Sequence, residues 1–158
     1  MSVTHSWHEK QLLEDLRDEI AKGDVEIVDD AAPSYTRLMG AFPVRMNRID
    51  WDAVPNARHL KPPPERSQSN FQLVEPAREL RAFWKQVRQD QNIGDEANVI
   101  VLGDSLVRFA LRLSVATLTR RLVDILSIPH HTYVFPEDVA WCFNYTAEDD
   151  GFFGLRPR

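Results

Sequence analysis

The sequence predicts a single α/β or α+β domain: a mixed sheet with a carboxy-terminal antiparallel meander and flanking helices. Three observations lead to this prediction. Apolar residues recur at helical spacing in three segments, one unbroken apolar run is typical of a strand buried on both faces, and three aromatic or β-branched runs close the chain. The chain has 158 residues, of which 43% are hydrophobic, enough for one domain with its own core. We therefore expect a single domain over residues 1–158.

The first element expected is an amphipathic helix from Trp7 to Lys22. Its leucines and an isoleucine lie on one face and its acids on the other. Ser6 and Glu9 form a capping box at its start, and Gly23 is suited to end it. The apolar residues that follow predict a short strand between Val25 and Val28.

Residues 31–74 form a long, proline-rich connection that periodicity does not resolve. It contains six prolines, and a loop of this length inside a compact domain is uncommon and tends to be functional or mobile. The alternative is an ordered coil that Phe42, Trp51 and Leu60 pack over the sheet. A fragment such as Phe42 to Met46 would then pair as an edge strand.

Regular structure is expected again after this connection. The pattern predicts a helix from Pro76 to about Gln91, a buried strand from Ala97 to Leu102 and a helix from Ser114 to Leu126. Strand, helix and strand in this order predict a right-handed crossover to a parallel strand at His131 to Phe135. The short acidic connections at the end of the chain predict an antiparallel meander with strands at 131–135, 139–146 and 151–155.

Composition excludes several classes of protein. The net charge of −5 argues against a dedicated duplex-binding domain, which carries a basic surface. The single cysteine, Cys142, excludes a disulfide framework and a multi-thiolate metal site, and it suits a reducing compartment. Its strand position predicts a buried, inert thiol. No signal peptide or uncharged apolar stretch is visible, so we expect a cytoplasmic protein without membrane contact. The acidic net charge leads us to expect no direct nucleic-acid binding. No Glu or Cys stands at a metal-ligand spacing around the histidines and no glycine-rich phosphate loop is present, so we expect no metal and no cofactor.

One motif suggests catalysis. The string Gly103-Asp104-Ser105-Leu106 follows the buried strand and resembles the opening block of the GDSL (SGNH) hydrolases, in which the serine is the nucleophile. The resemblance implies a small esterase that uses Ser105, Asp104 and His131. However, the family's Gly-x-Asn-Asp and Asp-x-x-His blocks are absent downstream, and too little chain follows for its doubly wound domain. A serine that caps a following helix is the alternative interpretation.

A second resemblance rests on the segment from Ile128 to Gly154. It contains a Pro-x-His-x-Tyr strand, an acidic turn, a Trp-Cys strand, and a second acidic turn with an aromatic-Phe-Gly ending. Over roughly Ala97 to Gly154 the chain resembles immunity proteins of contact-dependent growth inhibition, which are encoded beside polymorphic bacterial toxins. This resemblance implies a non-enzymatic partner that binds and neutralises a cognate toxin, commonly a basic nuclease.

The charge layout is compatible with such a role. Residues 1–30 carry a net charge of −6, residues 31–128 carry +4 and residues 129–158 carry −3. An acidic inhibitor mimics the charge of a nuclease substrate and accelerates encounter. The candidate toxin contacts are the acids near predicted turns: Glu26, Asp29, Asp30, Glu137, Asp138, Glu148, Asp149 and Asp150. The alternative is that these turns are acidic because they are solvated and because Asp favours turn geometry. Whether the two acidic ends form one face or two stays open at this stage.

The basic middle of the chain offers a third hypothesis, a nucleic-acid-associated accessory module. It would use the arginines between the two acidic ends: Arg37, Arg45, Arg48, Arg58, Arg66, Arg78, Arg81 and Arg88. After Leu60 these arginines alternate with acids, so a solvated surface is the alternative interpretation.

Overall fold

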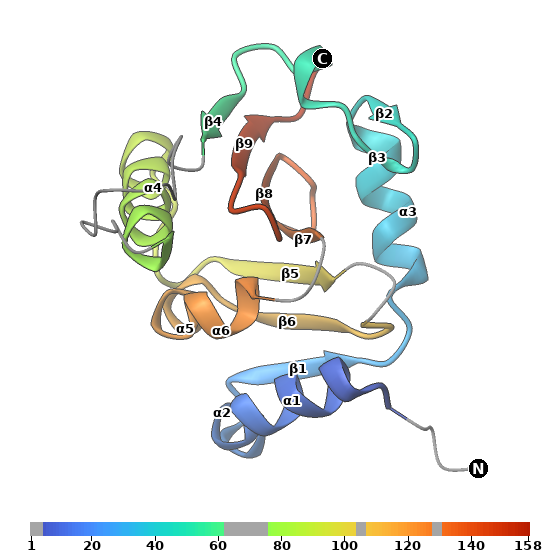
Figure 1. The fold of residues 1–158 in the computed structure, drawn as a ribbon, viewed down its shortest axis with the longest axis vertical. Coiled ribbons are helices and arrows are strands. Elements are labelled where there is room, and N and C mark those ends of the chain that lie inside the picture. The colour runs from blue at the N-terminus through green and yellow to red at the C-terminus, as the bar shows by residue number, and fades with distance from the viewer. Residues whose placement is uncertain (1–4, 62–75, 104–106, 128–130) are drawn as a thin grey trace, which may run out of the picture.

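A seven-stranded antiparallel sheet runs through the computed structural model, which describes residues 5–61, 76–103, 107–127 and 131–158 (Figure 1). The strand order is β1-β6-β5-β7-β8-β9-β4, and a separate two-stranded sheet pairs β2 with β3. The strands are β1 Val25–Val28, β2 Val44–Arg45, β3 Arg48–Ile49, β4 Arg58–Leu60, β5 Asn98–Gly103, β6 Ala110–Ser114, β7 His131–Phe135, β8 Trp141–Thr146 and β9 Gly151–Leu155. The predicted α+β domain and its closing antiparallel meander are confirmed.

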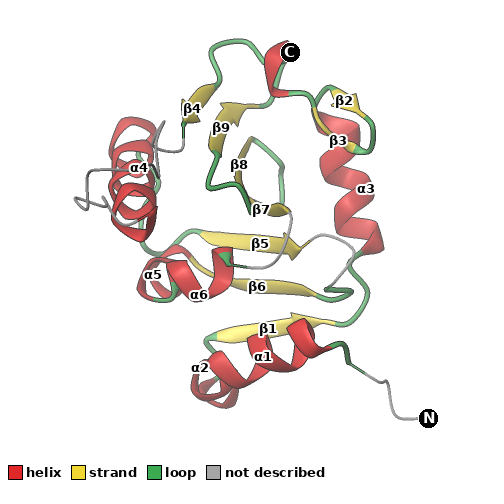
Figure 2. Cartoon of the chain, in the orientation of Figure 1, coloured by secondary structure: helices red, strands yellow, loops and turns green. Residues whose placement is uncertain are grey.

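Helices cover both faces of this sheet (Figure 2). They are α1 Trp7–Asp15, α2 Arg17–Lys22, α3 Ala32–Ala41, α4 Pro76–Gln91, α5 Val115–Arg120 and α6 Leu122–Leu126, with a 3-10 turn η1 at Trp51–Ala53. α1, α4, α5 and α6 contribute to the core on one face, and α3 contributes to the core on the other. The sheet therefore separates two apolar clusters.

Strand β5 lies between the two clusters. Val99 and Val101 pack into the cluster beneath α4, α5 and α6, whereas Ile100 and Leu102 pack into the cluster beneath α3. All four side chains are 1% exposed. The unbroken apolar run thus forms a strand buried on both faces, as predicted.

The amino-terminal elements follow their sequence signals with one change. The Ser6 hydroxyl accepts a hydrogen bond from the Glu9 backbone N–H at 3.1 Å, and the Glu9 carboxylate accepts one from the Ser6 N–H at 2.7 Å. The predicted capping box is therefore confirmed, and Gly23 ends α2 with a φ of 81°. The expected single helix is instead divided at Leu16 into α1 and α2.

The predicted parallel crossover is wrong, and with it the mixed sheet. β5 pairs with β7 antiparallel, with Ile100 opposite Phe135 and Gly103 opposite Thr132. The cause is β6, a strand that the sequence pattern did not predict, which forms an antiparallel pair with β5 before α5 begins. This extra reversal of the chain means that β7 runs opposite to β5, and every strand pair in the described sheet is antiparallel.

The described part of the proline-rich connection is ordered. Residues 32–41 form α3, whose Leu38 is fully buried with Phe42, and β4 pairs with β9 at the edge of the large sheet. The expected edge strand near Phe42 to Met46 is the short β2, which pairs with β3 outside the large sheet. Packing by Phe42 and Trp51 over the sheet agrees with the alternative of an ordered segment, and residues 62–74 lie outside the described ranges.

Two further expectations concern burial and membranes. Cys142 is 0% exposed, and burial raises the pKa of its thiol well above 9.0, which disfavours the reactive thiolate. In the described parts of the chain, no helix combines the length and the apolar character that a bilayer crossing requires.

Candidate binding surface

The first 30 residues place most of their charge on one edge of the sheet. We call residues 5–30, which form α1, α2 and β1, the acidic layer; they lie together at the lower end of the molecule in Figure 1. The layer contains nine acids and three bases. Six of its acids are exposed: Glu14, Asp18, Asp24, Glu26, Asp29 and Asp30. Residues 5–30 therefore bring a net charge of −6 to one edge of the domain. Part of this charge is offset by arginines from outside the layer that pair with its acids: Arg108, Arg112, Arg120 and Arg121.

The layer is held by apolar contacts on its inner side. Leu12 of α1 and Leu16, which lies between α1 and α2, are buried in the core, and Val25 of β1 pairs with Leu113 of β6. Because β1 has only one neighbouring strand, its one acid, Glu26, and the flanking Asp24 and Asp29 also protect an open sheet edge from pairing with other chains. Edge protection is the simplest structural interpretation of the charges in and beside β1.

Arg112 joins acids from the two ends of the chain. Its Nη1 lies 3.2 Å from Oε2 of Glu26, which is opposite it in the β1–β6 register, and its Nε lies 3.1 Å from Oε1 of Glu137 in the β7–β8 turn. The side chains of Glu26 and Glu137 are 62% and 59% exposed, so each ion pair contributes at most about 1 kcal/mol. The two ion pairs therefore contribute little to stability, but they hold the β7–β8 turn beside the acidic layer.

Several of the candidate acids stabilise turns. The carboxylates of Asp138 and Asp30 each accept a hydrogen bond from the backbone N–H two residues later, at 3.1 and 3.0 Å. The hydroxyl of Tyr145 donates to Asp149 at 2.9 Å, and Asp149 has a φ of 66°, a conformation that Asp tolerates well. For these three residues the structure supports the turn interpretation.

Asp150 pairs with a histidine that sequence reasoning did not select. Nε2 of His59 lies 2.8 Å from Oδ1 of Asp150, and the His59 ring stacks on Phe152 with centroids 4.4 Å apart. Phe152 stacks in turn on Trp51, whose indole N–H donates to Asn144 at 3.0 Å. His59 lies on β4 in the proline-rich connection, where no spacing in the sequence links it to Asp150. The pair joins β4 to the start of β9.

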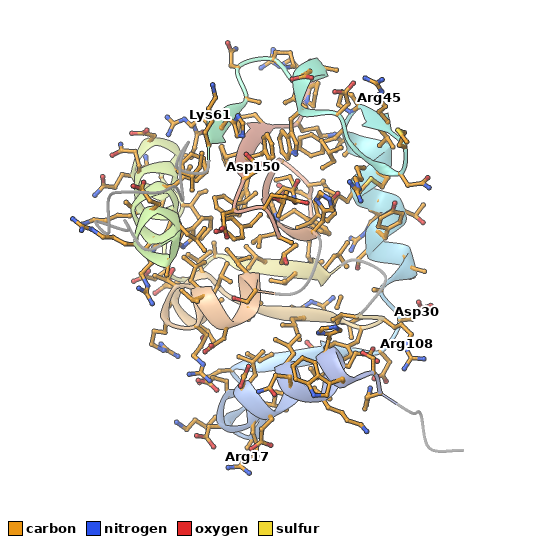
Figure 3. The ribbon with its side chains drawn as sticks, in the orientation of Figure 1. Arg17, Asp30, Arg45, Lys61, Arg108 and Asp150 are labelled. Carbon is orange, nitrogen blue, oxygen red and sulfur yellow. The ribbon has the colours of Figure 1, made fainter. Side chains whose placement is uncertain are left out.

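The eight candidate acids do not form one face. The β7–β8 turn, with Glu137 and Asp138, and the β8–β9 turn, with the exposed Glu148, lie at opposite ends of β8. Figure 3 shows Asp150 and Asp30 in different parts of the molecule. The amino-terminal acids and Glu137 therefore form one group, and residues 148–150 form another.

A buried acid ties the acidic layer to the rest of the fold. Glu9 is 1% exposed, and its carboxylate accepts hydrogen bonds from the Arg108 backbone N–H at 2.9 Å and from its Nη2 at 3.0 Å. Burial acts to raise the pKa of Glu9, but the hydrogen bonds from Arg108 and Ser6 outweigh it and lower the pKa from 4.5 to about 2. The sequence pattern predicts the capping role of Glu9 but not its contact with Arg108, 99 residues away.

The residues of the hydrolase hypothesis are only partly described. Asp104 and Ser105 lie outside the described ranges. Strand β5 ends at Gly103, which pairs with Thr132, so His131 lies at the same end of the sheet as Gly103. Within the described ranges, no group of three His, Cys, Asp or Glu residues is arranged to hold a metal ion.

Comparisons with known proteins give no family for this chain. No family model matches the sequence, and no curated protein is significantly similar to it. We therefore infer function from the acidic layer and the two ion pairs of Arg112, together with the resemblance of residues 97–154.

Proposed function

We propose that this protein is an immunity protein that binds a cognate bacterial toxin and occludes its active site without catalysis of its own. The observation that carries the proposal is the junction at Arg112, where the β7–β8 turn meets the acidic layer. The resemblance of residues 97–154 to immunity proteins supports the same role. The partner class that this surface fits best is a nuclease with a basic active site.

The physical basis is charge complementarity. A nuclease cleft is lined with cations that bind phosphates, and the six exposed acids of the acidic layer attract such a cleft, although Arg112 and Arg120 offset part of their charge. Attraction of this kind raises the association rate and falls with ionic strength, because the Debye length is only about 8 Å at physiological salt. Encounter would therefore be fast at low salt.

The contact is centred on Glu26, Asp29 and Glu137. Asp29 is exposed, and no hydrogen bond or ion pair joins its side chain to any residue that the structure describes. Glu26 and Glu137 each keep a largely exposed carboxylate despite their shared partner Arg112. These three acids can exchange water for toxin cations without breaking a turn, whereas Asp30 and Asp138 use one carboxylate oxygen inside the chain.

Co-expression with the toxin domain encoded immediately upstream tests the proposal. We expect a stable complex and rescue of growth. The double variant Glu26→Lys with Asp29→Lys should weaken toxin binding by at least about tenfold, because it reverses charges on the contact surface. The matched control is Asp52→Lys with Glu96→Lys, two exposed acids outside the layer, and it should leave binding within about twofold. Absence of a complex together with absence of rescue would rule the proposal out.

A second candidate function is a small serine esterase that uses Ser105. The observation that favours it is the β5–β7 register, which places His131 at the end of the sheet from which the Gly-Asp-Ser-Leu motif continues. Release of p-nitrophenol from short acyl esters by the purified protein would be the assay. Loss of this activity in Ser105→Ala would support the esterase, and equal rates in both proteins would dismiss it.

A further inference from the structure

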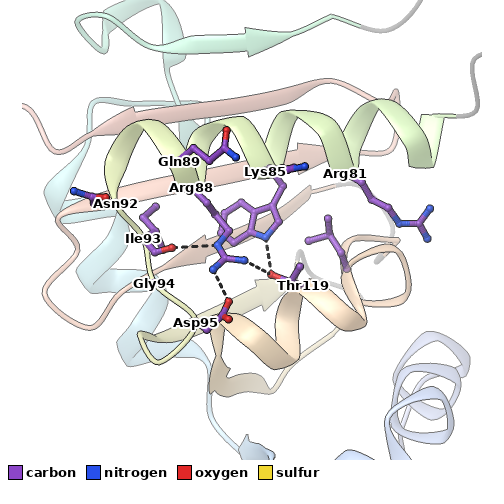
Figure 4. Close-up of a pocket in the computed structure, with 11 residues that line it drawn as sticks. Arg81, Lys85, Arg88, Gln89, Asn92, Ile93, Gly94, Asp95 and Thr119 are labelled. Carbon is purple, nitrogen blue, oxygen red and sulfur yellow. Dashed lines mark hydrogen bonds and ion pairs between the residues drawn. The ribbon is translucent and has the colours of Figure 1, made fainter.

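A cleft lies between α4 and the α5–α6 pair, on the face of the sheet that carries these helices. Its volume is about 680 Å³, and Figure 4 shows the residues that line it. None of its lining residues belongs to the acidic layer or to the Arg112 junction. The cleft therefore has no part in the proposed toxin contact, and a ligand bound there would be distinct from the toxin.

The wall formed by α4 is basic. Arg81, Lys85 and Arg88 follow one another at helical spacing, so they lie on one face of the helix. Asp95 is the one acid among the described residues that line the cleft, which leaves a local net charge of +2. Arg81 and Lys85 are exposed, and no ion pair or hydrogen bond joins either side chain to a described residue. Both cations are available to a ligand.

The third cation is held in place. Arg88 donates from Nε to the carbonyl oxygen of Ile93 at 3.1 Å and from Nη1 to the hydroxyl of Thr119 at 3.3 Å, and its Nη2 lies 2.5 Å from the carboxylate of Asp95. A guanidinium has five N–H donors, and these contacts use three of them. Two donors remain on a side chain whose position is already fixed, which lowers the entropic cost of binding an anion.

The floor of the cleft is hydrogen-bonded and largely apolar. The indole N–H of Trp84 donates to the Thr119 hydroxyl at 3.0 Å, and that hydroxyl donates to the Val115 carbonyl at 2.7 Å. Trp84 and Leu122 are nearly fully buried beneath this network. An apolar cavity with a few fixed polar groups is typical of sites for organic ligands rather than for simple ions.

We propose that this cleft binds a small organic phosphate, a phosphate ester of about the size of a nucleotide. Lys85 and Arg81 would contact the phosphate together with the two remaining donors of Arg88, and the organic part would lie against the apolar floor. A phosphate matches this wall better than a carboxylate does, because it carries up to two negative charges and three acceptor oxygens. The volume lies within the range of small-molecule sites.

Isothermal titration calorimetry on the full chain tests this inference without any toxin. The probes are adenosine monophosphate and glucose 6-phosphate, with adenosine and inorganic phosphate as the partial ligands. We expect one-to-one binding of at least one ester. The double variant Arg81→Glu with Lys85→Glu should weaken that binding by at least about tenfold. The matched control is Arg78→Glu, an exposed arginine on the same helix outside the cleft, and it should have no effect.

A steric variant separates filling of the cleft from the change of charge. Gly94 lines the cleft, its φ is not positive, and an added Cβ would meet no atom within 4 Å. Gly94→Phe should therefore fold normally and reduce ester binding. The inference is overturned if neither ester binds, or if adenosine or inorganic phosphate alone binds as tightly as the esters. It is also overturned if a single-stranded oligonucleotide binds through Arg81 and Lys85 while the esters do not, since the surface would then be a nucleic-acid site.

Discussion

The acids at the two ends of the chain differ in what they contact. Near the carboxy end, Asp138 and Asp149 complete turns and Asp150 pairs with His59, so these carboxylates hold the meander and β4 in place. In the acidic layer, six acids are exposed, and Asp29 has no partner among the described residues. Acids near predicted turns thus divide into residues that build the fold and residues that leave charge at the surface.

Three acids of the layer are not exposed, and Glu9 is the most deeply buried of them. Glu9 is almost fully buried and accepts hydrogen bonds from Ser6 and from Arg108. Glu14, five residues later, is 63% exposed and pairs with Arg17 at 3.5 Å only. Depth and partners, rather than position in the sequence, therefore decide what an acid contributes to stability.

The largest expected effect is that of Glu9→Gln. This change removes a buried charge that four hydrogen bonds from Ser6 and Arg108 stabilise. We expect the free energy of unfolding to fall by about 3 kcal/mol, measured by urea denaturation. The control Glu14→Gln should change stability by less than about 0.5 kcal/mol. Equal effects of the two variants would contradict the division between buried and exposed acids.

The same carboxylate predicts a pH dependence of stability. The pKa of Glu9 is lowered in the folded state from 4.5 to about 2, so its contribution is fully present above about pH 4.5 and is lost as the pH falls toward 2. The difference in unfolding free energy between wild type and Glu9→Gln should be constant from about pH 7 to pH 5. Below that range it should shrink by up to about 3 kcal/mol. A difference that stays constant down to about pH 2.5 would show that the charge of Glu9 does not stabilise the fold.

Local sequence signals were enough to predict the carboxy-terminal strands. The elements that were not predicted include strand β6, which depends on pairing with residues far away in the sequence. The β7–β8–β9 meander follows from short acidic turns between aromatic runs. Strand β6 was missed because Ala110–Ser114 is short and directly adjoins the pattern of the next helix; its strand state depends on pairing with β1, far earlier in the chain. Helix α3 was missed because Pro33 and Gly40 are poor helix formers, although Pro33 lies in the first turn, where it is tolerated.

The candidate site shows the same limit. The sequence predicts which acids lie near turns. It does not predict the contacts that decide whether each acid stabilises the fold or stays exposed. Arg112 is 86 residues from Glu26, and Arg108 is 99 residues from Glu9, so no spacing rule relates them. The cleft beside α4 likewise requires α4 to meet Thr119 of α5, a tertiary contact that neither helix pattern contains.

A smaller effect is expected for Asp150→Asn, which tests the fold-building acids. The variant keeps the shape of the side chain but removes the charge that faces His59. Because the two side chains are 37% and 29% exposed, the loss should be about 0.5 to 1 kcal/mol in urea denaturation. Glu148→Gln, in the same turn, is the control and should be neutral. A loss equal to that of Glu9→Gln would mean that partial exposure does not weaken this pair.

The smallest effect on stability is expected for Asp29→Asn, and this variant tests the other half of the comparison. Asp29 is exposed and has no partner among the described residues, so the unfolding free energy should change by less than about 0.5 kcal/mol. If the acidic layer binds the toxin, the same variant should slow association, and the difference from wild type should shrink as salt is raised from about 50 to 300 mM. A neutral effect on both stability and association would leave only edge protection of β1 as the role of this charge. A loss of stability above about 1 kcal/mol would instead place Asp29 with the acids that build the fold.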